Sequence, residues 1–388
     1  MRCGFAFFLL LFSIFAAAQS GPRIQISHTT ESLRGVSAVS HDVAWASGTH
    51  GTYLRTIDGG KTWTPAQVPE ASALDFRGVV AFSADEAFLM SAGPGEKSRI
   101  YHTSDGGQHW QLQFTNANPK GFFDSIAFWD ARHGLVLGDP IPDPSGKLHF
   151  ELLETDDGQT WHVMPSAQMP EALAGEGAFA ASNSCLALVP GTAGGRSGVS
   201  DTDGRTTTDA SDANIWFGTG GKVARVFHSA NGGKNWEVFE TPILHGPESA
   251  GIFSIAFRDA LHGVIAGGDY KRPRDDGPNL AFSEDGGRTW SVSEIRPQAY
   301  FSAAAYDRAV NQAAIQQEAA EKRARVKAVA LQRLFIVGTD FVFDFRPPNN
   351  PRRIGGKRKQ GYEFNAVSGL PEGGALVVGP KGTIAYIP

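Results

Sequence analysis

The sequence predicts an all-β chain assembled from similar units, and three observations support this prediction. A phrase of eight residues that joins Asp or Asn to glycine and ends in Trp occurs five times. Glycine is abundant, with 46 of the 388 residues, and aromatic residues make up 11%. Short segments of alternating apolar and small residues separate the phrases. Short strands at regular spacing, divided by turn residues, are typical of an all-β repeat fold.

Each copy of the phrase has the residues of a tight turn between two strands. The Asp or Asn side chain can accept hydrogen bonds from backbone N–H groups of its own turn. Glycine adopts positive φ without a Cβ penalty, and the Trp buries a large ring between neighbouring units. The turn residues that we assign a structural role are Asp58 and Trp63, Asp105 and Trp110, Asp156 and Trp161, Asn231 and Trp236, and Asp285 and Trp290.

This phrase resembles the Asp-box, or BNR, repeat of sialidases, some endoglucanases, sortilin-type receptors and the photosystem II stability/assembly factor family. In those families the repeat closes the outer hairpin of a propeller blade and carries no catalytic residue. Nearly the whole mature chain resembles the photosystem II stability/assembly factor-like propellers, on the phrases at 123–138, 253–267 and 378–382. The resemblance implies a non-catalytic assembly role and a mouth that binds a membrane-protein intermediate through an Arg-rich patch, represented here by Arg34 and Arg77.

Counting the repeated units gives seven blades. Five units carry the phrase, and two further units, at 300–345 and 364–387, lack it. The last unit is one strand short, and the spare strand Arg23–His28 can complete it and remove the open edge. We therefore predict a single seven-bladed β-propeller over residues 20–388, closed in blade seven by the N-terminal strand, with blade four opening at Glu176–Ala180.

Two segments depart from the repeat. Residues 307–332 contain no Gly or Pro and are rich in Ala, Glu, Lys, Arg and Gln, so we predict a helical insertion in blade six. Residues 1–19 combine a basic start, an apolar run and small residues, which predicts a cleaved signal peptide and a periplasmic or extracellular protein. That run is too short to be a transmembrane segment. Cys185 is then the only cysteine of the mature chain, which excludes an internal disulfide.

The predicted binding surface is one face of the propeller. Long loops after the second strands, at 139–147, 190–214 and 269–276, would share a face with the starts of the inner strands. Insertions on one face of a repeat protein usually mark its binding surface. We expect a mixed ring there to bind a ligand or partner, against the alternative of a solvated rim with compensating charges. The ring consists of Arg34, Arg77, Asp124, Glu176, Tyr270, Arg272 and Tyr300.

Catalytic and metal chemistry have weaker signals. Asp139 and Asp269 occupy equivalent places in blades three and five and would be the carboxylates of a carbohydrate-active hydrolase or lyase; turn-forming Asp is the structural alternative. The early Arg-Ile-Pro phrase of sialidases is not matched, because Arg23-Ile24 is followed by Gln. The Asp-rich loop 201–212 resembles a calcium loop in composition but lacks the final Glu. We expect neither metal nor cofactor.

The sequence thus predicts a secreted, non-catalytic binding or assembly propeller that docks a protein or glycan partner at one face. The alternative is a hydrolase or lyase that uses carboxylates on the same face. The net charge of −5 does not favour a nucleic-acid partner, and we expect a monomer.

Overall fold

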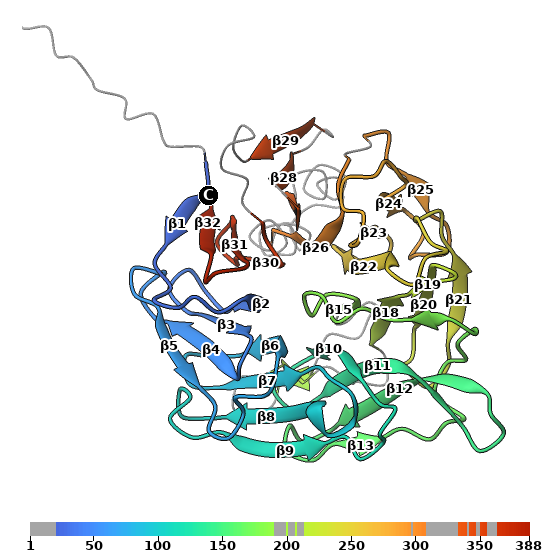
Figure 1. Ribbon diagram of the computed structural model, residues 1–388, viewed down its shortest axis with the longest axis horizontal. Helices are drawn as coiled ribbons and strands as arrows, with labels where there is room; N and C mark the ends of the chain where they lie inside the picture. The colour runs from blue at the N-terminus through green and yellow to red at the C-terminus, as the bar shows by residue number, and fades with distance from the viewer. Residues whose placement is uncertain are drawn as a thin grey trace, which may run out of the picture.

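Seven antiparallel sheets surround a central channel, as Figure 1 shows for this computed structural model. The structure describes residues 21–189, 199–200, 206–207, 213–295, 298–307, 333–339, 341–346, 350–354 and 363–388. Within these residues the fold is the seven-bladed β-propeller that the repeats predict. The predicted signal peptide lies outside the described residues, as does the Asp-rich loop 201–212 apart from the short strand at 206–207.

In the first three blades the strands follow one another in sequence order within each sheet. Blade one contains β2 (Leu33–Ala38), β3 (Ala44–Gly48), β4 (Thr52–Thr56) and β5 (Thr64–Gln67). Blade two contains β6 (Phe76–Ala81), β7 (Ala87–Ser91), β8 (Arg99–Thr103) and β9 (Gln111–Thr115), with the 3₁₀ turn η1 (Gly95–Lys97) before β8. Blade three contains β10 (Phe123–Phe128), β11 (Gly134–Pro142), β12 (Leu148–Thr155) and β13 (His162–Val163).

Blades four and five are joined by two added strands. Blade four contains β15 (Leu186–Val189), β18 (Asn214–Gly218), β20 (Arg225–Ser229) and β21 (Glu237–Glu240). Blade five contains β22 (Ala250–Phe257), β23 (Gly263–Asp269), β24 (Leu280–Ser283) and β25 (Ser291–Val292). Its sheet is extended by β19 (Gly220–Gly221) and β14 (Glu176–Gly177), while β16 (Val199–Ser200) and β17 (Thr206–Thr207) pair separately.

The N-terminal strand closes the ring, as predicted. Blade six contains β26 (Phe301–Tyr306), β27 (Leu334–Gly338), β28 (Phe341–Arg346) and β29 (Asn350–Ile354). Blade seven contains β30 (Ala366–Gly369), β31 (Ala375–Val378), β32 (Ile384–Ile387) and β1 (Arg23–Gln25). In Figure 1, β1 lies beside β32, and the two strands pair antiparallel with Gln25 opposite Ile384. This pairing covers an edge that would otherwise be open to another chain.

The core lies in layers between neighbouring sheets. Between blades two and three, for example, Phe88 and Met90 of β7 pack with Ile126 of β10 and Val136 of β11, all of them fully buried or nearly so. Similar apolar layers fill the other interfaces, which follows from the alternation of side chains along each strand. Each blade is therefore stabilised by its two neighbours, and a closed ring leaves no blade with a bare face.

The five repeated phrases form the same turn between the third and fourth strands. In blade one, the Thr56 hydroxyl donates to Asp58 Oδ1 at 2.9 Å and accepts from the Gly60 N–H at 2.9 Å, while Asp58 Oδ1 also accepts from the Thr62 N–H. The same bonds recur at the turns of blades two, four and five, with Ser replacing Thr in blades four and five.

Blade three corrects one predicted turn residue. Asp157, not Asp156, accepts the hydrogen bonds from the Thr155 hydroxyl and from the Thr160 N–H. Thr155 ends β12, and only five residues separate it from Trp161, one fewer than separate Thr56 from Trp63 in blade one. Asp157 keeps the position two residues after the Thr, and the residue missing from this turn lies between the carboxylate and Trp161.

A glutamine fastens the ring at the closure seam. Gln25 of β1 accepts a hydrogen bond from Trp63 Nε1 at 2.8 Å and donates one to the Gly59 carbonyl at 3.1 Å. Gln113 of β9 makes the same pair of bonds to Trp161 and Gly158 between blades two and three. The seam between the two ends of the chain is thus built like an internal contact between blades.

One of the two longest links in the chain joins other strands than the sequence predicted. Residues 190–213 connect β15 to β18, and residues 307–333 connect β26 to β27. Each link runs from the end of an inner strand to the start of the second strand of the same blade, and in an antiparallel blade those strand ends share a side with the repeat turns. The prediction that 190–214 follows the second strand of blade four, on the mouth side, is therefore wrong, because β15 is the inner strand of that blade. The loops after the second strands of blades three and five do lie there.

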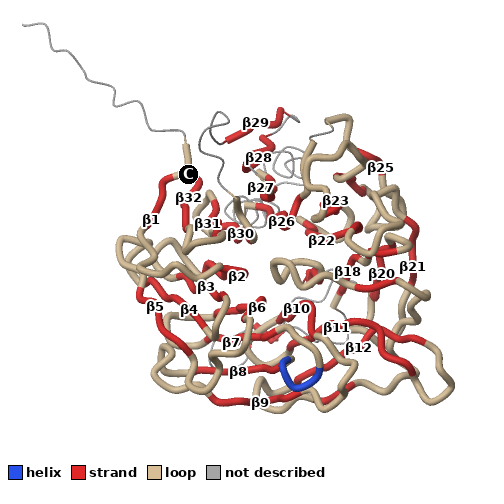
Figure 2. Tube along the Cα trace, viewed as in Figure 1, coloured by secondary structure: helices blue, strands red, loops and turns tan. Residues whose placement is uncertain are grey.

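The described part of the chain is almost free of helix. Its only helical element is η1, blue in Figure 2. The helical insertion predicted for 307–332 falls outside the described residues except for Asp307, so the structure lends that prediction no support. A search of the described residues finds no helix with the length and apolar character needed to span a bilayer.

We predict that Gln25→Ala weakens the closure seam. The change removes two partly buried hydrogen bonds and leaves the Trp63 N–H and the Gly59 carbonyl without their partner, so we expect a loss of about 1–2 kcal/mol in the free energy of unfolding. Urea denaturation followed by Trp fluorescence measures it. Ile24→Ala is the matched control, because Ile24 lies on the same strand and is 51% exposed. Equal losses in both variants would contradict the assignment.

Candidate binding site at the channel mouth

A cavity of about 910 Å³ opens at the mouth, on the side where the inner strands begin. Of the seven ring residues predicted from sequence, all of them described, six line this cavity, and Arg272 does not. The six are Arg34, Arg77, Asp124, Glu176, Tyr270 and Tyr300. Asp139 lines it as well, whereas Asp269 does not. The repeat thus brings residues from distant parts of the chain to one place.

A β-bulge near the start of the inner strand directs side chains into this cavity. Five inner strands share a three-residue pattern, an apolar residue, a variable residue and a small residue. In each of them the pairing register shifts at the variable residue. The residues at the bulge are Arg34, Arg77, Asp124, Phe253 and Ser302, and all five line the cavity. Bulges commonly re-aim one side chain in this way. Phe253 and Ser302 were missed from sequence, although the same three-residue pattern marks them.

A segment of the chain plugs the channel. Residues 178–184 precede β15, and Figure 1 shows this part of the chain reaching the centre of the ring. The Ser182 hydroxyl donates to the Ser302 carbonyl of blade six, and the Ser184 carbonyl accepts from the Ile255 N–H of blade five. The prediction that residues 176–180 form the inner strand of blade four is therefore wrong. That strand is β15, and the small residues of 177–184 let the backbone enter the crowded channel instead.

Asn183 anchors the plug to blade three. Its Oδ1 accepts from the Ile126 N–H at 2.7 Å and from the Ser125 hydroxyl, and its Nδ2 donates to the Ile126 carbonyl at 3.0 Å. One side-chain amide thus pairs both backbone groups of a residue on the inner strand. Asn183 has φ 61, a left-handed conformation that Asn tolerates better than most residues.

The plug also forms the floor of the cavity through three charged contacts. Arg77 Nη1 donates to the Ala180 carbonyl at 3.0 Å, and Asp139 Oδ1 accepts from the Ala178 N–H at 3.1 Å. Asp124 interacts with the backbone N–H of Ala180. Opposite charges from blades two and three therefore hold the same short stretch of backbone.

The two predicted arginines share a carboxylate that the sequence analysis missed. Asp75 Oδ2 lies 2.9 Å from Arg77 Nε, and its Oδ1 lies 3.6 Å from Arg34 Nε. Asp75 directly precedes β6, which places it between the starts of two inner strands. The positive charge that Arg34 and Arg77 offer to a ligand is thus partly neutralised within the site.

Two carboxylates of blade three lie in the floor, Asp124 buried and Asp139 half-buried. Burial raises the pKa of Asp124 well above its ordinary value, and the nearby Asp139 raises it further, while Arg77 opposes the change. Burial raises the pKa of Asp139 to about 6, although the Ala178 N–H lowers it somewhat. Asp124 is 1% exposed, and its Oδ2 has no hydrogen-bond partner.

Glu176, Asp269 and Arg272, which the sequence placed in the site, bond to other side chains of the protein. The buried carboxylate of Glu176 pairs with Arg225, whose Nε lies 3.0 Å from Oε1, and also accepts from the Thr219 hydroxyl. It therefore fixes the backbone just before the plug, and its carboxylate oxygens are engaged within the protein. Burial raises the pKa of Asp269, but hydrogen bonds from Ser249, Arg272 and the Lys271 N–H outweigh burial and lower the pKa overall. Of the two carboxylates of the predicted catalytic pair, Asp139 lines the cavity and Asp269 does not.

Aromatic rings form one wall of the cavity. Phe253 stacks on Phe179 of the plug with ring centroids 3.9 Å apart, and Tyr300 meets Phe253 edge-on at 4.7 Å. Gly220 permits this arrangement, since a Cβ there would lie 2.3 Å from the Phe179 ring. Tyr270 continues the wall to the rim and is 48% exposed. Burial raises the pKa of Tyr300, so its hydroxyl stays neutral.

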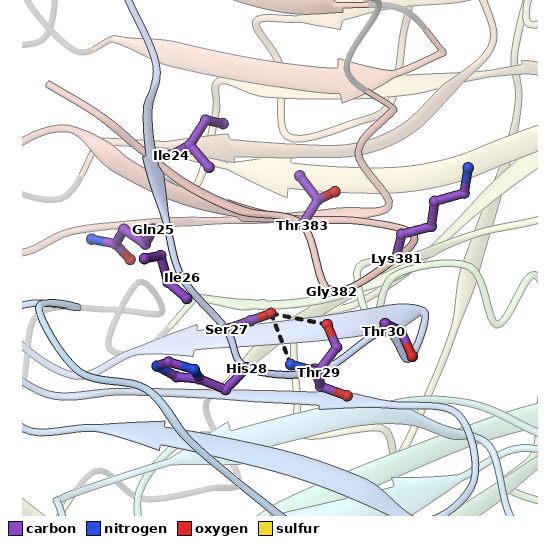
Figure 3. A pocket seen from close by; sticks show the side chains of 10 residues that line it. All are labelled: Ile24, Gln25, Ile26, Ser27, His28, Thr29, Thr30, Lys381, Gly382 and Thr383. Atoms are coloured by element: carbon purple, nitrogen blue, oxygen red, sulfur yellow. Dashed lines mark hydrogen bonds between the residues drawn. The ribbon is translucent and has the colours of Figure 1, made fainter.

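A second pocket lies at the closure seam, away from the mouth. It has a volume of about 650 Å³ and is formed by the chain leaving β1 and by the turn between β31 and β32 (Figure 3). Ser27 bonds within its own loop there, to Thr29. This pocket gathers no buried ionisable group, and we take the mouth as the candidate site. No group of three or more His, Cys, Asp or Glu residues suited to a metal ion occurs among the described residues.

We predict that Asn183→Ala destabilises the protein by about 2–4 kcal/mol, because it leaves the backbone of Ile126 unpaired inside the channel. Asn183→Gly relieves the left-handed backbone but loses the same bonds, and we expect it to recover only a small part of the loss. Chemical denaturation measures both. The exposed Asn235 supplies the control, since Asn235→Ala should change stability by less than about 0.5 kcal/mol.

We predict that Asp139→Asn stabilises the protein at neutral pH. The pKa of Asp139 is about 6 in the folded state against an ordinary 3.8, so the folded state holds its proton more tightly and stability falls as pH rises from 4 to above 6. The variant escapes this loss. We expect a gain of up to about 3 kcal/mol at pH 7.5, which corresponds to that difference in pKa, and little gain at pH 4. A gain independent of pH would contradict this origin.

Comparison with known proteins points to one family. The family model described as photosynthesis system II assembly factor YCF48 matches residues 17–121. The photosystem II stability/assembly factor HCF136 of Arabidopsis thaliana is 33% identical over 66 residues, which span 16% of this chain and about 15% of that relative.

Two solved structures extend the likeness to the whole fold. YCF48 bound to D1 peptide aligns over 96% of each chain with a TM-score of 0.58 and 14% identity. YCF48 from Cyanidioschyzon merolae aligns over 95% of this chain and 98% of that chain, with a TM-score of 0.53 and 17% identity. At these identities the likeness concerns the fold. With the sequence match over its first repeats, the chain is a β-propeller that resembles the photosystem II stability/assembly factor family.

Proposed function

We propose that this protein is a non-catalytic binding or assembly propeller that docks a protein partner at the channel mouth. The observation that carries the proposal is the convergence of bulged side chains from five blades on one cavity with a solid floor. A site of this kind holds charged and aromatic groups on rigid strands, as a recognition surface requires.

The contacts of the floor support binding rather than turnover. Arg77, Asp124 and Asp139 each interact with the backbone of the plug, which ties them to the scaffold. The carbohydrate-active alternative relied on Asp139 with Asp269, and Asp269 lies outside the cavity lining with Arg272 on its carboxylate. The solved YCF48 structure with a D1 peptide shows that a propeller of this fold can hold a peptide.

The leader sequence supports a location for this function. Residues 1–19 have the pattern of a secretory signal, so we place the binding in the periplasm or outside the cell. The mouth carries both acidic and basic side chains, which favours a specific protein segment as the partner. A glycan is the alternative partner to be tested.

We predict that a photo-crosslinking residue at Tyr270 captures a discrete protein from the exported fraction of the producing cells. Tyr270 is 48% exposed on the rim of the cavity. The same residue at Ile57 is the control, because Ile57 is 60% exposed in a repeat turn on the opposite side. Mass spectrometry identifies the product. Identical products at both positions, or turnover of a glycan that Asp139→Asn abolishes, would contradict the proposal.

A further inference from the structure

We propose that the mouth selects a partner segment that inserts a lysine or arginine side chain between the blade-three carboxylates and the aromatic wall. The blade-three carboxylates are Asp124 and Asp139, and the aromatic wall consists of Phe179, Phe253, Tyr270 and Tyr300. This inference rests on the proposed function and names the chemistry of its partner.

The charges that line the cavity favour a cation. Asp75 engages both Arg34 and Arg77, and Arg77 also donates to the plug. Acidic groups remain on the other blades: Asp124 and Asp139 in the floor, and the exposed Glu248 and Glu363 at the rim. Among the lining residues that the structure describes, Lys120 is the cation that no ion pair engages. An acidic segment would therefore meet mostly like charge.

Asp124 supplies an acceptor that the protein itself does not use. Its side chain lines the cavity, is 1% exposed, and leaves Oδ2 without a hydrogen bond. A buried carboxyl oxygen without a partner is costly, and a cationic donor satisfies it most strongly. The alternative is that the bulge buries Asp124 without a function. That alternative does not explain why a second carboxylate, Asp139 of the adjacent strand, lies beside Asp124.

The aromatic wall suits the rest of a basic side chain. Lysine and arginine have apolar stems that pack on rings while the charged end reaches a polar partner. A cation over an aromatic face gains further attraction, and Lys271 Nζ already lies 5.9 Å from the Tyr270 ring centre at the rim. The cavity of about 910 Å³ is large enough for such a side chain and its neighbours.

Binding of a cation would be linked to pH. The groups that face the blade-three carboxylates are Arg77 from β6, Cys185 before β15, the Ala178 and Ala180 N–H groups of the plug, and the two carboxylates themselves. A cation binds Asp139 more tightly when that carboxyl is ionised, so its affinity rises as Asp139 loses its proton, while Asp124 offers its unbonded oxygen. With a pKa of about 6 for Asp139, we expect affinity to rise about tenfold from pH 5 to pH 7.5.

The test uses four immobilised pools of acetylated octapeptides, randomised except that position four is Lys, Arg, Gln or Glu. We expect the purified protein to bind the Lys and Arg pools at least tenfold more than the Gln and Glu pools at pH 7.5, and to lose this preference at pH 5. In Asp124→Asn and Asp139→Asn the preference should fall at least tenfold. Asp42→Asn is the control, because Asp42 is exposed between β2 and β3, on the opposite side from the mouth.

Two outcomes separate this inference from the proposed function. Asp139→Asn should be more stable than the parent at pH 7.5, so a loss of preference in that variant is not a loss of folding. Equal binding to all four pools, or preference for the Glu pool, overturns the inference. If Tyr270 still crosslinks a discrete protein in that case, docking at the mouth stands and only the basic side chain is refuted.

Discussion

The filling of the channel is the constraint on which the rest of this structure depends. A ring of seven sheets brings its inner strands together around an axis, where polar backbone groups and small side chains meet. Here the plug 178–184 satisfies those groups, with Asn183 pairing the backbone of Ile126 and Ser182 reaching blade six. Because it contacts several blades at once, the plug holds the ring from within, as the strand pairing of β1 holds it at the rim.

The site follows from the same plug. The bulged side chains would otherwise point into an open channel, and the plug instead gives them backbone groups to bind. It also carries Phe179, which positions Phe253 in the aromatic wall. Recognition groups are thus fixed by contacts that also stabilise the fold, and rigid placement of this kind reduces the entropy lost on binding.

Repetition explains which features the sequence could predict. The hydrogen bonds of Asp58 and its equivalents form within single turns, and the closure by β1 follows from counting strands. Both features can therefore be predicted from the sequence. Residues 176–180 were predicted as an inner strand because they have the alternating pattern of one. Only their place in the three-dimensional channel distinguishes such a strand from the plug. Asp75 and the shifted turn at Asp157 depend on spacing in three dimensions, whereas Phe253 and Ser302 share the three-residue pattern and were available in principle.

The position of the family match bears on the partner. Residues 17–121 cover β1 to β9, and their bulged contributions to the mouth are Arg34 and Arg77. Asp124 and Asp139 of the floor come from blade three, beyond that match. A carboxyl kept buried with a raised pKa lowers stability at neutral pH, and proteins usually retain such groups where function requires them. The part of the mouth outside the matched residues therefore supplies the carboxylates on which the proposed recognition of a basic side chain rests.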